Sequence, residues 1–206
     1  KDAAKKIECA EEILPHLAKG LPARTLKGIN NIKEWIKEFN LITIKPVIFV
    51  CNVDENSILN GNEFTNKLKE KIDENIILIS ADIESQIATL GDEEQLEFLS
   101  SLGLEESGLN KIIKEGYRAL DLITYFTSGE QETRAWTIGK STLAPDAAGK
   151  IHSDFKDGFI RAETVAFEDF ISCNGEAKAR ELGKLKSEGK EYIVQDGDVM
   201  HFLFNN

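Results

Sequence analysis

Residues 45–55 read KPVIFVCNVDE and residues 76–81 read IILISA. The apolar, mostly β-branched run that opens each stretch is typical of a strand buried on both faces, and we expect strands over residues 44–51 and 76–79. Between them, Phe64, Leu68 and Ile72 recur at helical spacing and predict a helix over residues 62–73. The region therefore predicts one parallel strand–helix–strand unit with a right-handed crossover.

Helical patterns precede and follow this unit. Residues 1–40 carry apolar side chains at helical spacing, interrupted at Gly20 and Pro22, which predicts two short helices resembling the end of a helical hairpin. Two further helices are expected over residues 92–102, with Asp92 as N-cap, and over residues 107–120.

Beyond Leu120 the chain changes to short strands separated by turn residues. Strands are expected at residues 122–127, 133–138 and 160–167, with a turn at 128–130 and a helix at 175–182. Residues 192–194 and 199–204 flank the tight-turn sequence QDGD, which predicts a hairpin. This mixture indicates a small α+β domain over roughly residues 119–206.

Composition and charge restrict the classes of protein. Of 206 residues, 41% are hydrophobic and 30% are charged, a globular balance, and the net charge of −11 argues against binding DNA or anionic membranes through bulk electrostatics. No apolar run approaches the ~20 residues that span a bilayer. Three well-separated cysteines argue against a disulfide framework or a zinc site and fit a reducing cytosol. Because the chain begins at Lys1 and its single methionine is Met200, we expect a fragment of a longer protein.

The most informative local sequence is Asn52-Val53-Asp54-Glu55, directly after the first predicted strand. P-loop GTPases carry Asn-Lys-x-Asp at this place, where the last carboxylate reads guanine; here Val53 and Glu55 depart from that pattern. The alternative is an ordinary polar turn. Ser80-Ala81 ends the next strand, and because ligands of α/β sheets bind at the carboxyl ends of strands, both loops would line one crevice.

Other motifs have simpler explanations. Gly139-Lys140-Ser141-Thr142 resembles the end of a Walker A loop, but the position of the first glycine holds Arg134, so we interpret it as a turn. His152, near Arg161 in the sequence, suggests a catalytic pair or, without a nucleophile nearby, a locally bonded histidine. The basic residues between 178 and 190 suggest a solvated helix face, and Asp196-Gly197-Asp198 a turn rather than a calcium loop.

Five motifs together indicate a family. They are LITYFTSG at 122–129, RAWTI at 134–138, AGKIHSDF at 148–155, GFIRAE at 158–163 and DGDVMHF at 196–202. They closely resemble the C-terminal TGS domain of the YchF / Obg-like ATPase family, and residues 52–55 are similar to that family's altered base motif, Asn-x-x-Glu. The similarity covers essentially the whole chain.

The resemblance implies an α/β plus α+β layout. Residues 1–40 would be the tail of a helical, coiled-coil insertion, residues 41–118 the last part of a Rossmann-like P-loop NTPase domain, and residues 119–206 a ubiquitin-like β-grasp TGS domain. Asn52, Val53 and Glu55 would contact the nucleotide base, with Ser80 and Ala81 as the second base-side loop. Catalytic and metal-binding residues would lie before Lys1, so the chain alone is expected to be inactive.

The resemblance also implies ligands and partners. Such proteins bind and hydrolyse ATP in preference to GTP, require Mg²⁺, and associate with ribosomes in the cytoplasm; we expect the large subunit as the partner, with RNA contact through the TGS domain, and neither membrane nor DNA. The alternative function is a non-catalytic module whose TGS domain binds a ribosomal or RNA-bound partner.

Overall fold

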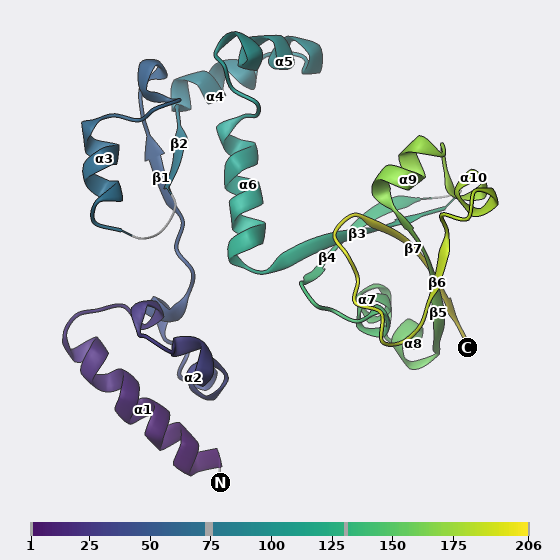
Figure 1. Ribbon diagram of the computed structural model, residues 1–206, viewed down its shortest axis with the longest axis horizontal. Coiled ribbons are helices and arrows are strands. Elements are labelled where there is room, and N and C mark those ends of the chain that lie inside the picture. The colour runs from purple at the N-terminus through teal and green to yellow at the C-terminus, as the bar shows by residue number, and fades with distance from the viewer. Residues whose placement is uncertain (1, 73–75, 130–131, 206) are drawn as a thin grey trace. The chain divides into compact units, whose positions relative to one another are not determined.

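The computed structural model describes residues 2–72, 76–129 and 132–205 (Figure 1). Its contacts divide the chain into two compact units, Lys1–Ile113 and Lys114–Asn206. Three residues of the predicted elements lie outside the described residues: Lys1 and Asp73 of the predicted helices, and Glu130 of the predicted turn. None of the described helices is long and apolar enough to cross a membrane.

Two helices form the N-terminal part of the first unit, as the sequence predicts. They are α1 (Asp2–Ala18) and α2 (Ile29–Ile36), joined by the short 3-10 turn η1 (Ala23–Thr25) and followed by η2 (Lys37–Phe39) and η3 (Ile42–Ile44). They enclose a small apolar cluster of Cys9, Ile13, Ala23, Ile32 and Ile36. Gly28 adopts a left-handed conformation (φ 79°) directly before α2, which allows the chain to reverse between the helices.

The predicted strand–helix–strand unit is present. Strand β1 (Phe49–Asn52) pairs in parallel with β2 (Ile76–Ile79), and α3 (Glu63–Lys69) lies between them in sequence. Asn62 caps α3, because its side-chain oxygen accepts hydrogen bonds from the backbone N–H groups of Phe64 and Thr65.

Two details of that prediction are wrong. The first strand starts at Phe49 rather than residue 44, because Ile42–Ile44 forms the turn η3 and Pro46 offers no N–H donor to a ladder. The strands are also not buried on both faces. Val50 is 41% exposed, since β1 and β2 form a two-stranded sheet within the described residues.

Three helices follow β2, and the boundary between the two units falls within the last of them. They are α4 (Ala81–Ile87), which the sequence analysis missed, α5 (Asp92–Ser101) and α6 (Gly108–Ala119). The N-cap of α5 is Gly91 rather than the predicted Asp92, and the Glu94 carboxylate accepts a hydrogen bond from the Gly91 N–H. Ile83, Ile87 and Leu99 pack with Val53 and Ile58 in one apolar cluster beside β1 and β2.

The second unit is built on a five-stranded mixed sheet in the order β4-β3-β7-β5-β6. The strands are β3 (Leu122–Ser128), β4 (Thr133–Gly139), β5 (Phe159–Ala166), β6 (Lys186–Glu188) and β7 (Asp198–Phe204). The central pair β3 and β7 is parallel, and the other pairs are antiparallel. The predicted strands at 122–127, 133–138 and 160–167 are confirmed within one residue, whereas β6 was not anticipated.

Helices lie on both faces of this sheet (Figure 1). Helices α7 (Ala144–Ile151) and α8 (Ser153–Asp157) cover the face that carries Tyr125, Ala162 and Phe202. Helices α9 (Phe167–Ser172) and α10 (Glu176–Glu181) cover Val165. Because Ala162 and Val165 are three residues apart in β5, their side chains point to opposite faces. The helix expected over 175–182 is therefore confirmed as α10.

The predicted hairpin of residues 192–194 with 199–204 is wrong. Both edges of β7 are occupied by β3 and β5, and Ile193 instead forms an isolated bridge with Leu143. The turn itself is real, because the Asp198 N–H donates to the Gln195 carbonyl oxygen at 3.2 Å. Its side chains bond to other segments: the Asp196 carboxylate accepts from the Thr124 N–H, and the Asp198 carboxylate accepts from the Tyr192 hydroxyl. Polar anchoring, rather than strand pairing, fixes this loop.

Candidate functional site

The two loops singled out from the sequence meet at the carboxyl ends of β1 and β2. Asn52 pairs with Ile79 in the ladder, and the Val53 N–H donates to the Ile79 carbonyl oxygen at 2.8 Å. The Asn52 side-chain oxygen then accepts a hydrogen bond from the Ala81 N–H at 3.0 Å. Residues far apart in the chain are thereby fixed next to one another, and Asn52 stabilises the second loop directly.

The remaining residues of the first loop have different environments. Val53 is buried in the apolar cluster, so its side chain serves packing. The Asp54 carboxylate accepts hydrogen bonds from the Ser57 N–H and hydroxyl, which caps the short turn η4 (Glu55–Ser57). Glu55 is exposed, and its carboxylate makes no hydrogen bond or ion pair within the described residues. Among the acidic side chains of this loop, Glu55 is the one left available to a ligand.

Ser80 carries an unusual buried hydroxyl. The residue is 1% exposed, and its Oγ has no hydrogen-bond partner among the described residues. An unpaired buried polar atom costs roughly 1–3 kcal/mol, so a hydroxyl at this place is favoured when a ligand or water completes its bonding.

Glu84, on helix α4 directly after the second loop, connects α4 to α6. The sequence analysis missed this residue. Its carboxylate accepts hydrogen bonds from the N–H groups of Gly108 (2.7 Å) and Leu109 (3.1 Å), the first residues of α6. The partners lie 24 and 25 residues away along the chain, and no local sequence signal connects them.

Comparison with known proteins adds independent information. Residues 122–205 match the family model YchF-GTPase_C, described as a protein of unknown function (DUF933). The whole chain is 47% identical over 208 residues to the ribosome-binding ATPase YchF of Escherichia coli O157:H7 and 48% identical over 210 residues to that of Bacillus subtilis. The chain resembles the C-terminal portion of YchF-type proteins. It spans 57% of the length of these relatives.

Two solved structures are similar to this chain. The YchF GTPase of Schizosaccharomyces pombe is 37% identical, with a TM-score of 0.82 over 95% of this chain and 53% of that one. A GTP-binding protein from Pyrococcus horikoshii, 18% identical, matches with a TM-score of 0.55 over 98% of this chain and 56% of that one, which shows similarity of fold.

Several residues of the YchF-type motifs have structural roles here. His152 caps α8, because its Nδ1 accepts a hydrogen bond from the Asp154 N–H at 3.2 Å. Phe155 stacks on Phe204 at 3.9 Å between ring centroids. A Cβ atom added to Gly158 would lie 2.0 Å from the Asn205 carbonyl oxygen, so only glycine fits. The interpretation of His152 as a locally bonded residue is confirmed.

The Walker-like sequence is a turn, as expected. The Thr142 N–H and hydroxyl both donate to the Gly139 carbonyl oxygen, and the Lys140 N–H donates to the Asp121 carbonyl oxygen. Ser141 has a left-handed backbone (φ 70°). These bonds occupy the backbone N–H groups of Lys140 and Thr142, and Arg134 stands where a phosphate-binding loop has its first glycine.

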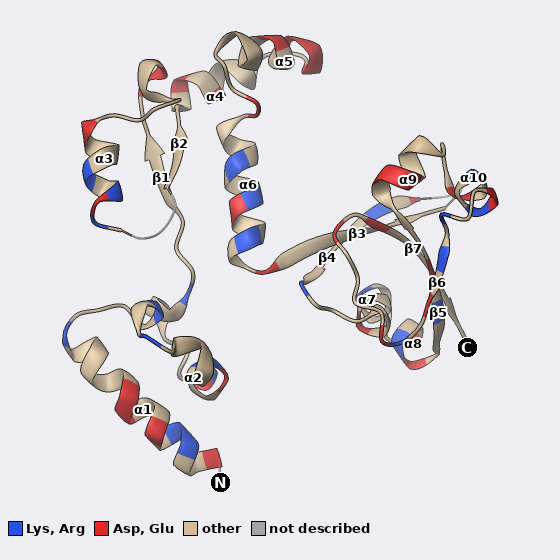
Figure 2. Ribbon diagram, in the orientation of Figure 1, with Lys and Arg blue, Asp and Glu red and all other residues tan. Residues whose placement is uncertain are grey.

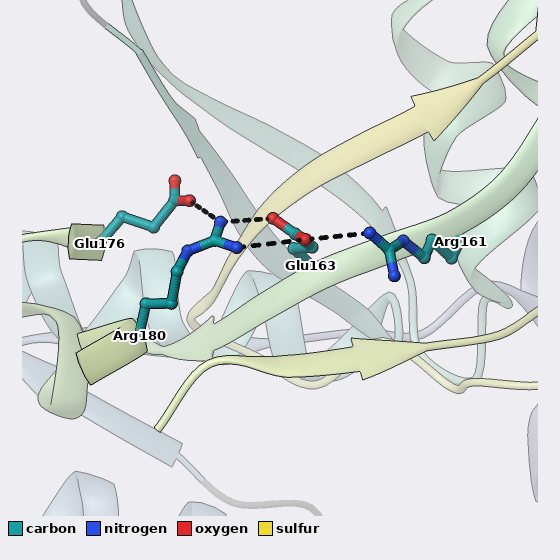
Figure 3. Close-up of polar contacts among 4 residues, drawn as sticks. All are labelled: Arg161, Glu163, Glu176 and Arg180. Carbon is teal, nitrogen blue, oxygen red and sulfur yellow. Dashed lines mark hydrogen bonds and ion pairs between the residues drawn. The ribbon is translucent and has the colours of Figure 1, made fainter. Parts of the chain in front are cut away.

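Arg161 belongs to an ion-pair network and makes no contact with His152 in the described part of the chain. Its guanidinium lies 3.3 Å from the Glu163 carboxylate, and that carboxylate accepts a 2.6 Å hydrogen bond from Arg180, which also contacts Glu176 (Figure 3). The hydrogen bond from Arg180 is the largest cause that lowers the pKa of Glu163, with smaller contributions from Arg161 and His201.

The basic residues between 178 and 190 do not form one helix face. They are distributed over α10, the loop before β6, β6 itself and the loop after it (Figure 2), and Lys184 pairs with Asp169 at 3.3 Å. The expectation of a solvated helix face is therefore correct for α10 alone. No group of three or more His, Cys, Asp or Glu side chains suited to a metal ion occurs within residues 2–72, 76–129 and 132–205.

Proposed function

We propose that this chain is the C-terminal portion of a YchF-type nucleotide hydrolase and supplies the base-binding side of its nucleotide site. The observation that carries the proposal is the hydrogen bond from the Ala81 N–H to Asn52, which joins the loops at the ends of two parallel strands. This is the place where α/β sheets bind ligands. The relatives' names, ribosome-binding ATPase and GTPase, support a nucleotide as the ligand.

The loop chemistry favours adenine over guanine. Guanine presents two adjacent donors that one short carboxylate accepts together, whereas adenine presents a donor and an acceptor that a backbone carbonyl and amide can serve. The Val53 carbonyl oxygen can accept from the adenine 6-amino group, whereas the Val53 N–H already donates to the Ile79 carbonyl oxygen. Glu55 has a carboxylate arm one methylene longer than aspartate. Asn52, Ser80 and Ala81 complete the base-side set. We therefore propose ATP as the preferred nucleotide, with GTP bound more weakly.

The residues present fit the base end of the nucleotide rather than its phosphate end. Asn52, Ser80 and Ala81 lie at the carboxyl ends of the parallel strands β1 and β2, whereas residues 1–206 contain no G-x-x-x-x-G-K-[S/T] sequence. Bound Mg²⁺ would neutralise developing charge on the phosphates, through residues outside this chain. The chain's own contribution is to bind and orient the base, and by itself it should not hydrolyse ATP.

The strand order supports a ubiquitin-like β-grasp TGS domain over residues 119–206. A helix, α7, follows an antiparallel pair, and the first and last strands of the unit, β3 and β7, lie parallel at the centre of the sheet. Residues 41–118 would then be the end of the Rossmann-like nucleotide-binding domain, and residues 1–40 the tail of its helical insertion.

The proposed partner is the ribosome, in the cytoplasm. The support is the name of the bacterial relatives, ribosome-binding ATPase. We place the contact on the large subunit, with the TGS domain touching RNA through a local patch because the chain as a whole is acidic.

The test uses the full-length protein that contains these residues. We expect Asn52→Ala to weaken Mg·ATP binding about tenfold, because Ala81 loses its acceptor, and to leave binding of inorganic tripolyphosphate unchanged. Asn60→Ala, an exposed asparagine outside both loops, is the matched control. Equal ATP binding by wild type and Asn52→Ala would contradict the proposed site, and phosphate release by the 206-residue chain alone would contradict the assignment of catalysis to other residues.

A second candidate is a non-catalytic module that binds a ribosomal or RNA-bound partner. It is favoured by one observation: the second unit contains its own sheet and two apolar clusters. Co-sedimentation of residues 114–206 with ribosomes, together with a full-length protein that hydrolyses neither ATP nor GTP, would favour this alternative.

A further inference from the structure

One peptide group of the proposed base-side loop is held at both ends. The N–H of the Ser80–Ala81 peptide donates to Asn52 Oδ1 at 3.0 Å, and its carbonyl oxygen accepts from the Glu84 N–H at 2.9 Å. The orientation of this peptide therefore depends on where Asn52 and Glu84 lie. Asn52 lies at the end of β1, and Glu84 lies on α4, which packs through buried Ile83 and Ile87 and is joined to α6 by the Glu84 side chain.

The Glu84 carboxylate binds the start of α6. Each of its oxygens accepts one backbone N–H, from Gly108 and from Leu109, and Ser107 Oγ accepts the N–H of Asn110. The first N–H groups of a helix have no partner within it, and an anion there is stabilised by the helix dipole. Glu84 is thus a bidentate cap supplied by a different helix.

Close packing makes this contact specific. A Cβ added to Gly108 would lie 2.7 Å from Ile79 Cγ2 and 3.0 Å from Glu84 Oε1. The start of α6 consequently lies directly against the last residue of β2. Glycine at 108 permits the approach that lets Glu84 reach two amides at once.

We infer that Glu84 is a positioning residue for nucleotide binding, because it holds the Ser80–Ala81 peptide in place by fixing α4 to the first turn of α6. The inference rests on the proposed function, since it assigns the nucleotide base to that loop. Glu84 does not contact the base itself. Its removal leaves the phosphate end of the ligand untouched and disturbs the loop where the buried Ser80 hydroxyl lies.

The chain provides a matched control for this role. The Glu94 carboxylate also accepts a backbone N–H, that of Gly91, at the start of a helix. Glu94 lies on α5, and its cap involves neither α4 nor α6. A variant of Glu94 therefore reports the general cost of losing a glutamate cap.

The experiment compares wild type, Glu84→Ala, Glu84→Gln and Glu94→Gln in the full-length protein. Dissociation constants are measured for Mg·ATP and for inorganic tripolyphosphate, which has no base. We expect Glu84→Ala to weaken ATP binding about tenfold with tripolyphosphate unchanged. Glu84→Gln should be intermediate, because its amide oxygen still accepts one bond, and Glu94→Gln should match wild type. Parallel weakening of both ligands, or no change in either, overturns the inference.

Amide hydrogen exchange in the 206-residue chain separates this inference from the proposed function. Glu84→Ala should accelerate exchange at Gly108, Leu109 and also Ala81, whereas Glu94→Gln should not. Unchanged exchange at Ala81 overturns the positioning role whatever the ligand. A different outcome is that wild type binds no nucleotide while exchange at Ala81 still accelerates in Glu84→Ala. The proposed function would then be wrong, and so would the part of the inference that concerns nucleotide binding.

Discussion

At the scale of single residues, Val53 and Glu55 of the first loop differ in burial and therefore in role. Val53 is buried beside Ile83 and Leu99, so a lysine there, as in P-loop GTPases, would place a charge in an apolar cluster. Glu55 is exposed and can be changed without disturbing packing. Base selectivity is therefore best tested at Glu55.

We predict that Glu55→Asp in the full-length protein shifts the ratio of ATP to GTP affinity toward GTP. A shorter carboxylate can accept both guanine donors together, and hydrogen bonds to a charged group contribute roughly 1.5–3 kcal/mol, or about tenfold in affinity. Glu55→Gln, which keeps the length of the side chain, should leave the ratio near wild type. The measurement is the dissociation constant of ATP and of GTP for each variant. An unaltered ratio in Glu55→Asp would mean that Ser80 and Ala81, rather than Glu55, select the base.

Two glycines of α6 give a paired test at the scale of the element. We predict that Gly108→Ala destabilises the packing of α6 by roughly 1–3 kcal/mol, because the new methyl group meets Ile79. Gly116→Ala should stabilise the helix by roughly 0.5–1 kcal/mol, since nothing lies within 4 Å of its Cβ position. Exchange of the α6 amides in the 206-residue chain measures both effects. Equal responses of the two variants would contradict the close approach of α6 to β2.

The network that joins β5 to α10 predicts a pH dependence. Arg180, then Arg161 and His201, lower the pKa of Glu163, so the folded state favours the ionised carboxylate. This stability is present above the unfolded pKa of about 4.3 and is lost as the pH falls through the lower folded pKa. Near pH 7, Glu163→Gln should cost roughly 0.5–1 kcal/mol.

The control for that network is Glu176→Gln, which removes the more exposed of the two carboxylates bound to Arg180. Urea unfolding of the second unit, followed from about pH 7 down to about pH 2, should show wild type converging on Glu163→Gln as the carboxylate protonates. Glu176→Gln should show a smaller difference at every pH. A constant gap between wild type and Glu163→Gln across this range would show that the loss arises from packing.

Periodicity predicted most elements because hydrophobic spacing reflects the local environment of each residue. It located β2, β3, β4 and β5. The two loops of the candidate site were recognised from their motifs at the ends of the predicted strands. The partner of residues 192–194 could not be predicted in this way. Ile193 bridges Leu143, which is distant in sequence, rather than pairing with the nearby strand in a hairpin. The same limit hid Glu84, whose partners at 108 and 109 are defined only once α6 lies against β2.

At the scale of the whole molecule, the two units differ in how far their strands are covered. In the first unit, β1 and β2 pair only with each other among the described residues, and Val47 and Val50 are 40% and 41% exposed. In the second unit, five strands share one sheet with helices on both faces. A two-stranded sheet is marginally stable, whereas a larger sheet with an apolar core can fold by itself.

We therefore predict that residues 114–206 fold independently. Tyr125 is fully buried, donates a hydrogen bond from its hydroxyl to the Ala147 carbonyl oxygen, and makes an edge-to-face contact with Phe202, so the strands and α7 share one core. The isolated segment should unfold in urea in a single cooperative transition, with β3 and β7 amides strongly protected from exchange. Residues 1–113 alone should show weaker protection at β1 and β2.

Gly158→Ala, which forces a methyl group into the Asn205 carbonyl, should abolish cooperativity in the 114–206 segment. Gly189→Ala, with open space around its Cβ position, should leave the transition unchanged. A non-cooperative transition in the unmodified segment would mean that this sheet depends on the preceding unit for its stability.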